Sequence, residues 1–204
     1  WQVRILPYMD QAPLYEQVNM LSPDAPSENG TDGRPLRLNQ VPYALCPSDT
    51  NQRERDTNWA QSNYCGSLGS QSTPSSNTSC QPWQQFAEPL AAGNAGHGNS
   101  ANGRTISGMF SRMGMGAGLR DMVDGPSNVI MVGEIRPQCH DHTAGWWRQN
   151  AMANAHASTV VPINNVTTCE EAITNPALAS HPTCTAQNNW NFSWGFRSRH
   201  SGGA

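Results

Sequence analysis

The most strongly apolar run in the chain covers residues 129 to 132, Val-Ile-Met-Val. It follows four turn-forming residues, Asp124-Gly125-Pro126-Ser127, and it ends shortly before the charged residue Glu134. A short apolar run between a turn and a charge is typical of a strand that is buried on both faces. The sequence therefore predicts that residues 129–132 form the central, buried strand of a sheet.

Residues 3 to 20 carry apolar side chains at roughly helical spacing, but Pro7 and Pro13 interrupt the pattern. A proline inside a helix removes a backbone hydrogen bond and ends or kinks the helix. The pattern therefore predicts two short helical pieces, the second from Ala12 to Asn19 with Pro13 in its first turn.

Further short strands are predicted at residues 41–46, 62–67 and 106–113. Aromatic residues at positions 190, 192, 194 and 196 recur with a period of two, which predicts a strand over 190–199 with one aromatic face. Polar segments rich in Gly, Ser, Asn and Pro separate these elements. The predicted fold is α+β, with an antiparallel sheet, few helices and long loops, in a single globular domain that spans residues 1–204.

The charge pattern limits the possible partners. The chain has 12 basic and 15 acidic residues, and all the basic residues are arginines. These arginines are scattered, whereas binding to nucleic acids or to anionic lipid surfaces requires clustered positive charge. We therefore expect no nucleic-acid partner.

Six cysteines, an even number in a loop-rich chain, favour an oxidising compartment and three disulfides that pin the loops. Two pairs bracket polar loop segments, and the third pair is what then remains. The favoured pairings are Cys65–Cys80, Cys169–Cys184 and Cys46–Cys139, and the other pairings of six cysteines stay open.

Candidate metal ligands occur in two places. The sequence Cys139-His140-Asp141-His142 brings together groups that bind zinc or copper, but a complete site needs further ligands. Asp121 and Asp124 offer oxygen ligands for calcium, although a helix cap at Asp121 and a turn at Asp124 explain them more simply. We therefore expect no metal and no other cofactor.

Catalytic motifs are missing from the sequence. It contains neither the G-x-S-x-G nucleophile elbow nor the H-E-x-x-H zinc motif. Ser48-Asp49 has the character of a turn in which Asp49 caps the backbone. We therefore expect that the protein is not an enzyme.

Four segments of the chain stand out as motifs. They are residues 1–17 (W-Q-V-R-I-L-P-Y-M-D-Q-A-P-L-Y-E-Q), 41–49 (V-P-Y-A-L-C-P-S-D), 119–135 (L-R-D-M-V-D-G-P-S-N-V-I-M-V-G-E-I) and 196–204 (F-R-S-R-H-S-G-G-A). They resemble, in the same order, segments of a bacterial family of pilin-like surface proteins. In that family a prepilin-type N-terminal helix precedes a domain of unknown function that ends in a His-x9-Asp-Gly motif, and the last segment here resembles the opening of that motif.

The resemblance implies a pilin-like head at the cell surface or in the periplasm, anchored to the envelope. The family's N-terminal membrane and assembly helix is absent from this sequence, and contact with the membrane would occur only through it. Because the chain begins and ends inside matching segments, we interpret it as a fragment truncated at both ends. Without the helix we expect an exposed apolar face that includes some of Leu6, Met9, Leu14 and the strand Trp190–Phe196.

Two functions are therefore considered. The first is a non-catalytic structural subunit of an extracellular pilus-like filament or a type II secretion-like pseudopilus, whose partners are copies of itself or related pilin-like subunits. The second is an envelope-anchored module that binds a solute or saccharide against tryptophan rings. The candidate residues for such binding are Trp146, Trp147 and Trp190, with Trp59 and Trp83. The alternative role of these side chains is to close a small core.

Overall fold

A computed structural model describes residues 1–49, 59–74, 83–87, 96–137, 145–147, 156–164 and 190–200. Helices and strands in these segments are short: α1 spans Gln2–Ile5, α2 Ala12–Tyr15, α4 Trp190–Ser193, β1 Tyr64–Ser67, β2 Val132–Glu134 and β3 His156–Ala157. Short 3-10 helices lie at Leu6–Met9, Ala25–Ser27, Leu36–Leu38, Pro42–Ala44, Gln84–Phe86, Gly96–Gly98, Gly103–Thr105, Leu119–Asp121 and Pro126–Asn128. The predicted α+β class is compatible with this combination.

Strand β1 lies at the centre of a three-stranded sheet with the order β2-β1-β3. It pairs antiparallel with β2, where Cys65 faces Gly133, and parallel with β3, where Gly66 faces His156. The sheet among the described residues is therefore mixed, and the prediction of a purely antiparallel sheet is wrong. The sequence did predict β1 itself, within residues 62–67.

The apolar run at 129–132 does not form the central strand. Only Val132 belongs to β2, which is an edge strand because it pairs with β1 alone in the part of the chain that the structure describes. Ile130, Met131 and Val132 expose 41, 43 and 42% of their surface. The prediction of a buried central strand here is wrong, since burial was inferred from hydrophobicity and the topology places this run at the edge.

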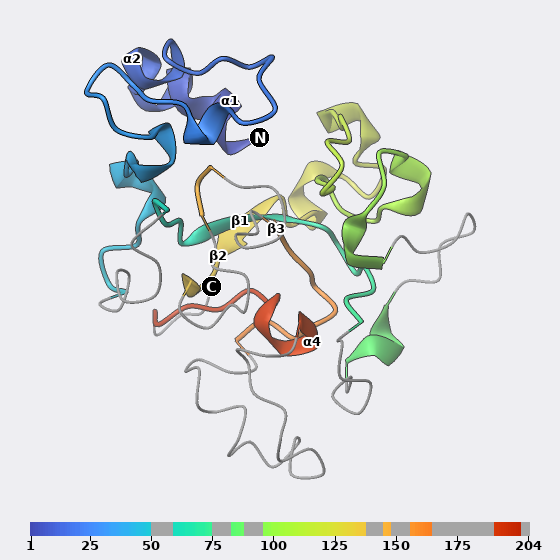
Figure 1. The fold of residues 1–204 in the computed structure, drawn as a ribbon. Coiled ribbons are helices and arrows are strands. Elements are labelled where there is room, and N and C mark those ends of the chain that lie inside the picture. The colour runs from blue at the N-terminus through green and yellow to red at the C-terminus, as the bar shows by residue number, and fades with distance from the viewer. Residues whose placement is uncertain are drawn as a thin grey trace.

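The N-terminal segment forms a core of its own beside the sheet. Pro7 and Pro13 each lie in the first turn of a short helix, as the sequence predicted for Pro13, and the helices remain short. The buried side chains of this core are Leu6, Leu36, Val41, Ala44, Ala60, Trp146 and Trp147. In Figure 1 this segment, drawn in blue, lies above one side of the sheet, and residues 96 to 131, drawn in green to yellow, lie on the other.

The segment from Trp190 to Phe196 is not a strand. It begins as helix α4, so that Trp190 and Trp194 lie one helical turn apart with ring centroids 6.1 Å from each other. Of the residues expected on an exposed apolar face, Leu6, Trp194 and Phe196 are buried, whereas Met9, Leu14 and Trp190 are half-buried. Residues 41–46 and 106–113 also form no strand.

Two glycines allow aromatic rings to lie directly on the sheet. A Cβ atom on Gly66 of β1 would lie 2.7 Å from the ring of Phe110, and one on Gly133 of β2 would lie 2.6 Å from the ring of Phe196. Both distances are too short for any larger residue. Gly133 thereby brings the C-terminal segment against β2.

The disulfide predictions are wrong where the structure describes them. Cys46 and Cys65 are both buried thiols, so the pairings Cys46–Cys139 and Cys65–Cys80 are not formed. Cys65 belongs to β1 and packs with Ile135, Ala157 and Phe196, and this burial raises the pKa of its thiol. The pairing Cys169–Cys184 lies outside the described residues. The loops described here are therefore held by packing and hydrogen bonds.

No helix in the described segments has the length and apolar character needed to cross a membrane.

Candidate functional site

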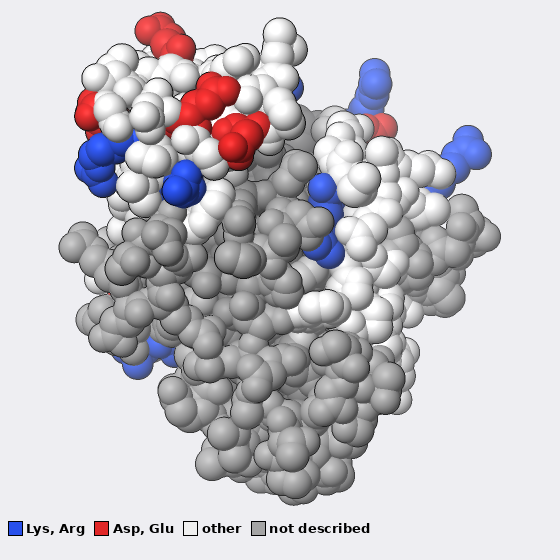
Figure 2. Space-filling model, viewed as in Figure 1, with Lys and Arg blue, Asp and Glu red and all other residues white. Residues whose placement is uncertain are grey.

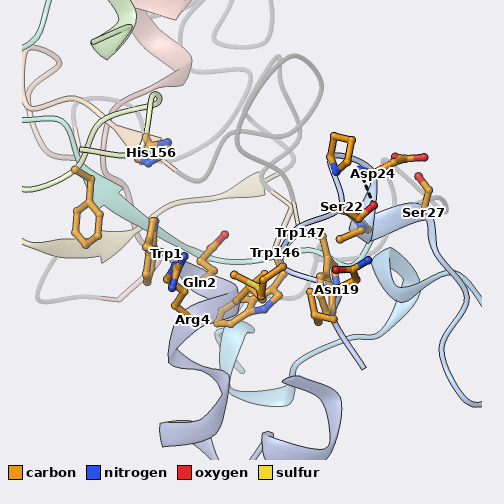
Figure 3. Close-up of a pocket in the computed structure, with 18 of the residues that line it drawn as sticks. Trp1, Gln2, Arg4, Asn19, Ser22, Asp24, Ser27, Trp146, Trp147 and His156 are labelled. Carbon is orange, nitrogen blue, oxygen red and sulfur yellow. Dashed lines mark hydrogen bonds between the residues drawn. The ribbon is translucent and has the colours of Figure 1, made fainter. Parts of the chain in front are cut away.

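A pocket of about 800 Å³ lies between the N-terminal segment and residues 110 to 116. Its aromatic lining comes from Trp1, Trp59, Phe110, Trp146 and Trp147. In Figure 3 Trp1 and His156 lie at one end near the sheet, Asn19, Ser22, Asp24 and Ser27 lie at the other end, and Trp146 and Trp147 lie between them. The volume falls within the usual range of small-molecule sites, and we call this cavity the aromatic pocket.

Backbone contacts fix the two neighbouring tryptophans at the base of the pocket. Gly145 forms a bridge with Gln61, and the Trp146 backbone N–H donates to the Ala60 carbonyl over 2.9 Å. Trp146 and Trp147 expose only 3 and 5% of their surface and pack into the N-terminal core. They therefore serve both expected roles, since they close a core and line the pocket.

Some polar groups in the aromatic pocket have hydrogen-bond partners in the described part of the chain and one does not. Trp147 Nε1 donates to the Asn39 carbonyl over 3.1 Å, and Gln2 Nε2 donates to the Tyr64 carbonyl over 3.2 Å. Trp146 Nε1 is buried and has no hydrogen-bond partner among the described residues. A buried indole N–H without a partner costs free energy, so it is suited to donate to a bound molecule.

Few charged groups line the pocket. Arg4 and Asp24 carry opposite charges, and the N-terminal amino group of Trp1 adds a positive charge whose pKa burial lowers. Burial lowers the pKa of His156 from 6.5 to about 3, with smaller contributions from the positive charges of the N-terminal amino group and of Arg112. His156 is therefore neutral at physiological pH, which removes one possible partner for an anion.

Figure 2 shows that the acidic side chains on the visible face gather mostly over the N-terminal segment, whereas the basic ones are spread out. The exposed acidic residues of that segment are Asp10, Glu16, Asp24, Glu28 and Asp32. This acidic surface next to the pocket further disfavours an anionic ligand.

A second group of reactive side chains lies elsewhere, around His200, and we call it the polar cluster. Cys46 Sγ lies 3.3 Å from His200 Nε2, and Glu134 Oε2 lies 3.5 Å from the same nitrogen. Ser48 Oγ lies 3.0 Å from Cys46 Sγ and 3.3 Å from His200 Nε2. Cys46 and Glu134 are buried, while 53% of the His200 side-chain surface is exposed. The polar cluster therefore opens to solvent on its histidine side.

A buried ion pair lies behind the polar cluster. Asp49 Oδ1 lies 3.7 Å from Arg136 Nε, with side-chain exposures of 1 and 2%. Asn63 connects the ion pair to Cys46, since its Nδ2 donates to Asp49 Oδ2 over 2.9 Å and its Oδ1 accepts from the Cys46 backbone N–H over 3.0 Å. Asp49 therefore has a buried structural role, beyond the turn that the sequence predicts.

Asp121 and Asp124, the calcium candidates from the sequence, lie in neither the aromatic pocket nor the polar cluster. Asp121 Oδ2 accepts from the Gly118 backbone N–H over 2.8 Å, and the Asp124 carbonyl accepts from Asn128 Nδ2 over 2.7 Å. These are the cap and the turn that the sequence allowed, and the two residues belong to no group of three candidate metal ligands among those described. Residues 139–142 lie outside the described residues.

Trp190 and Trp83 do not line the aromatic pocket. Trp190 packs edge-on against His97 with ring centroids 4.7 Å apart, and Trp83 stacks on Phe86 at 6.3 Å. Of the tryptophans singled out from the sequence, the structure therefore brings Trp59, Trp146 and Trp147 together.

The sequence did not single out Glu134 and His200 as site residues, and it assigned Cys46 to a disulfide. The three residues lie in different segments of the family resemblance, and no periodicity or spacing in the sequence indicates that these segments meet.

The comparisons with known proteins give one result for the whole chain. No curated protein and no solved structure matches it. A family model with the short name SBP_bac_10, described as "Protein of unknown function (DUF1559)", matches residues 1–204. The match includes every segment that builds the aromatic pocket and the polar cluster, and the chain therefore belongs to this family, which is associated with bacterial surface proteins.

Proposed function

We propose that this domain is a non-catalytic module at the bacterial cell surface that binds a neutral, hydroxylated solute, such as a saccharide, in the aromatic pocket. The observation that carries the proposal is the pocket of about 800 Å³ lined by four tryptophans and Phe110. Indole rings present a flat apolar face and a polar N–H, which suits the alternating apolar and hydroxyl surfaces of a sugar ring.

The charges of the lining support a neutral ligand. Arg4 and Asp24 carry opposite charges, His156 is uncharged and the neighbouring surface is acidic, so the surroundings of the pocket do not favour an anion. The buried Trp146 Nε1 supplies a donor for a hydroxyl oxygen, while the hydroxyls of Ser22 and Ser27 both line the far end. A saccharide fits these groups better than a carboxylate or a phosphate does.

A glycan panel tests this function by isothermal titration calorimetry and by tryptophan fluorescence. Trp59→Ala is the informative variant, because Trp59 lines the pocket and is only half-buried. We expect it to weaken binding about tenfold, equivalent to about 1.4 kcal/mol. Trp190→Ala is the matched control, since Trp190 is also half-buried and lies outside the pocket.

The binding proposal is contradicted if the protein binds no member of the glycan panel. It is also contradicted if Trp190→Ala weakens binding as much as Trp59→Ala, because the tryptophan effect would then not be specific to the pocket.

A second candidate function, assembly as a pilin-like subunit of a filament or pseudopilus, is favoured by a different observation. Ile130, Met131 and Val132 form an exposed apolar run that leads into the edge strand β2. Unpaired edges with exposed apolar side chains are common sites of strand addition and subunit contact. We call this run the apolar edge.

Electron microscopy of the native, full-length protein at the cell surface tests the assembly function. Filaments that disappear in Ile130→Asp and persist in Trp59→Ala support assembly through the apolar edge. Isolated, non-filamentous particles that still bind a solute support the first function and contradict the second.

A further inference from the structure

The donor atoms of Cys46, Glu134 and His200 converge on one point. The thiol sulfur, a carboxylate oxygen and a ring nitrogen all lie within 4.8 Å of one another. We propose that these three residues form a binding site for a divalent transition metal of the zinc type. This proposal is independent of solute binding in the aromatic pocket.

The distances agree with tetrahedral coordination. Typical bond lengths to zinc and tetrahedral angles place a sulfur and a nitrogen ligand about 3.6 Å apart, and a nitrogen and an oxygen ligand about 3.4 Å apart. The observed separations are 3.3 Å between Cys46 Sγ and His200 Nε2, and 3.5 Å between His200 Nε2 and Glu134 Oε2. An ion therefore fits between the three groups with only small side-chain adjustments.

The same geometry argues against a nucleophilic cysteine. In a catalytic triad the base contacts the nucleophile through one ring nitrogen, and the acid orients the base through the other nitrogen. Here Cys46 and Glu134 both approach Nε2 of His200. Glu134 is therefore not placed to orient His200 through its other ring nitrogen, whereas three donor atoms this close to one another can share one ion.

Glu134 provides an independent indication of a ligand. It is only 8% exposed, and its Oε1 has no hydrogen-bond partner among the described residues. A buried carboxylate that is only partly satisfied is costly, and a cation bound beside it lowers that cost. Its Oε2, the oxygen that lies 3.5 Å from His200 Nε2, accepts a hydrogen bond of 2.6 Å from Ser198 Oγ. Such a contact holds a ligand carboxylate in place beside its metal.

The donor set indicates which kind of metal would bind. A thiolate and an imidazole select zinc, cobalt or copper, whereas calcium and magnesium require oxygen ligands. Ser48 Oγ lies beside the sulfur and the ring nitrogen, so the fourth position faces this hydroxyl and solvent. On binding, the thiol proton of Cys46 is released to solvent and the sulfur lone pair forms the metal bond.

Metal binding would also connect distant parts of the chain. Cys46 and His200 are 154 residues apart, and Glu134 lies on β2. An ion at this point therefore fastens the C-terminal segment to the sheet. We expect the protein to unfold at a higher temperature in the presence of zinc.

A cobalt titration of the reduced 204-residue chain, kept in a non-chelating phosphine reductant, tests the site. We expect one equivalent of Co²⁺ to bind, with a sulfur-to-cobalt charge-transfer band and the intense visible bands of tetrahedral cobalt, and Zn²⁺ to displace it. Cys46→Ser should remove the charge-transfer band. His200→Ala, at a largely exposed side chain, should leave the fold intact and weaken binding at least tenfold.

Two control variants exclude other thiols and other ligand clusters. Cys65→Ser keeps the proposed ligands and should leave the spectrum unchanged. The double variant His140→Ala/His142→Ala removes the other histidine cluster in the sequence and should also have no effect. The proposal is overturned if no stoichiometric binding occurs, if the charge-transfer band survives Cys46→Ser, or if the double variant abolishes it.

Discussion

The apolar edge and the Asp49–Arg136 ion pair have environments that are the reverse of what the polarity of their side chains suggests. Ile130, Met131 and Val132 are exposed by 41 to 43%, whereas the Asp49 and Arg136 side chains are exposed by 1 and 2%. Only three residues separate Val132 from Arg136. The most apolar run of the sequence thus lies at the surface, and an ion pair lies inside.

The C-terminal segment accounts for this difference. Within the described segments, the outer edge of β2 carries no further strand, and residues 130 to 132 are exposed. At Gly133 the ring of Phe196 covers the strand, and at Glu134 the carbonyl accepts from the Arg197 backbone N–H over 2.9 Å. Burial along this segment therefore depends on which part of the chain lies above it, and only weakly on the polarity of each residue.

Replacing Ile135 by aspartate should have the largest effect. Ile135 is 1% exposed and packs with Cys65, Ala157 and Phe196. An unpaired carboxylate at this position costs several kcal/mol, on the order of the whole stability of a domain. We expect Ile135→Asp to abolish cooperative urea unfolding followed by tryptophan fluorescence. A well-defined transition near the wild-type midpoint would contradict the burial.

Removing the cation of the ion pair should have the next largest effect. Arg136→Ala leaves the Asp49 carboxylate buried without its arginine, so we expect a loss of about 3 to 5 kcal/mol in the free energy of unfolding. The double variant Asp49→Asn/Arg136→Met keeps the hydrogen bond from Asn63 and should be less destabilised than Arg136→Ala. A double variant less stable than the single one would show that the pair is not coupled in this way.

Acidification should reveal a third buried polar group, His156. Its folded pKa of about 3 lies below the ordinary 6.5, so the unfolded chain binds the extra proton at intermediate pH. The stability that His156 contributes is complete above pH 6.5 and decreases as the pH falls toward 3, by about 1.4 kcal/mol per pH unit.

Urea unfolding at pH 7 and at pH 4 measures this dependence. We expect the wild type to lose roughly 3 kcal/mol more than His156→Gln over that interval, since glutamine does not titrate. Equal losses in both proteins would mean that folding does not lower the pKa of His156.

Replacing Ile130 by aspartate should have the smallest effect on folding. The exposed side chain keeps its carboxylate in water, so we expect the free energy of unfolding to change by less than about 1 kcal/mol. The sequence pattern predicts a large loss of stability instead, because a buried central strand at residues 129–132 would not tolerate the charge. Sedimentation of the same variant then measures any loss of self-association. A large loss of stability would indicate that Ile130 is buried, and would contradict its exposure in the structure.

Local features of this protein could be predicted from the sequence. Turn residues and periodicity indicated β1 and the short, proline-interrupted helices, because these depend on neighbours within a few residues. The cap at Asp121 followed from the same kind of local chemistry. The abundance of tryptophan suggested an aromatic site, although not which rings would meet.

Tertiary structure alone decided the rest, because it depends on contacts between residues far apart in the chain. Aromatic residues at 190 and 194 fit a strand with a period of two and also a helix with a period near four, and the packing of Trp194 selected the helix. The pairing of β1 with β3 and the place of β2 at the edge follow from topology. Cys65 became a core thiol because its strand lies at the centre of the sheet. The meeting of Cys46, Glu134 and His200 likewise required the C-terminal segment to return to β2, which no local pattern encodes.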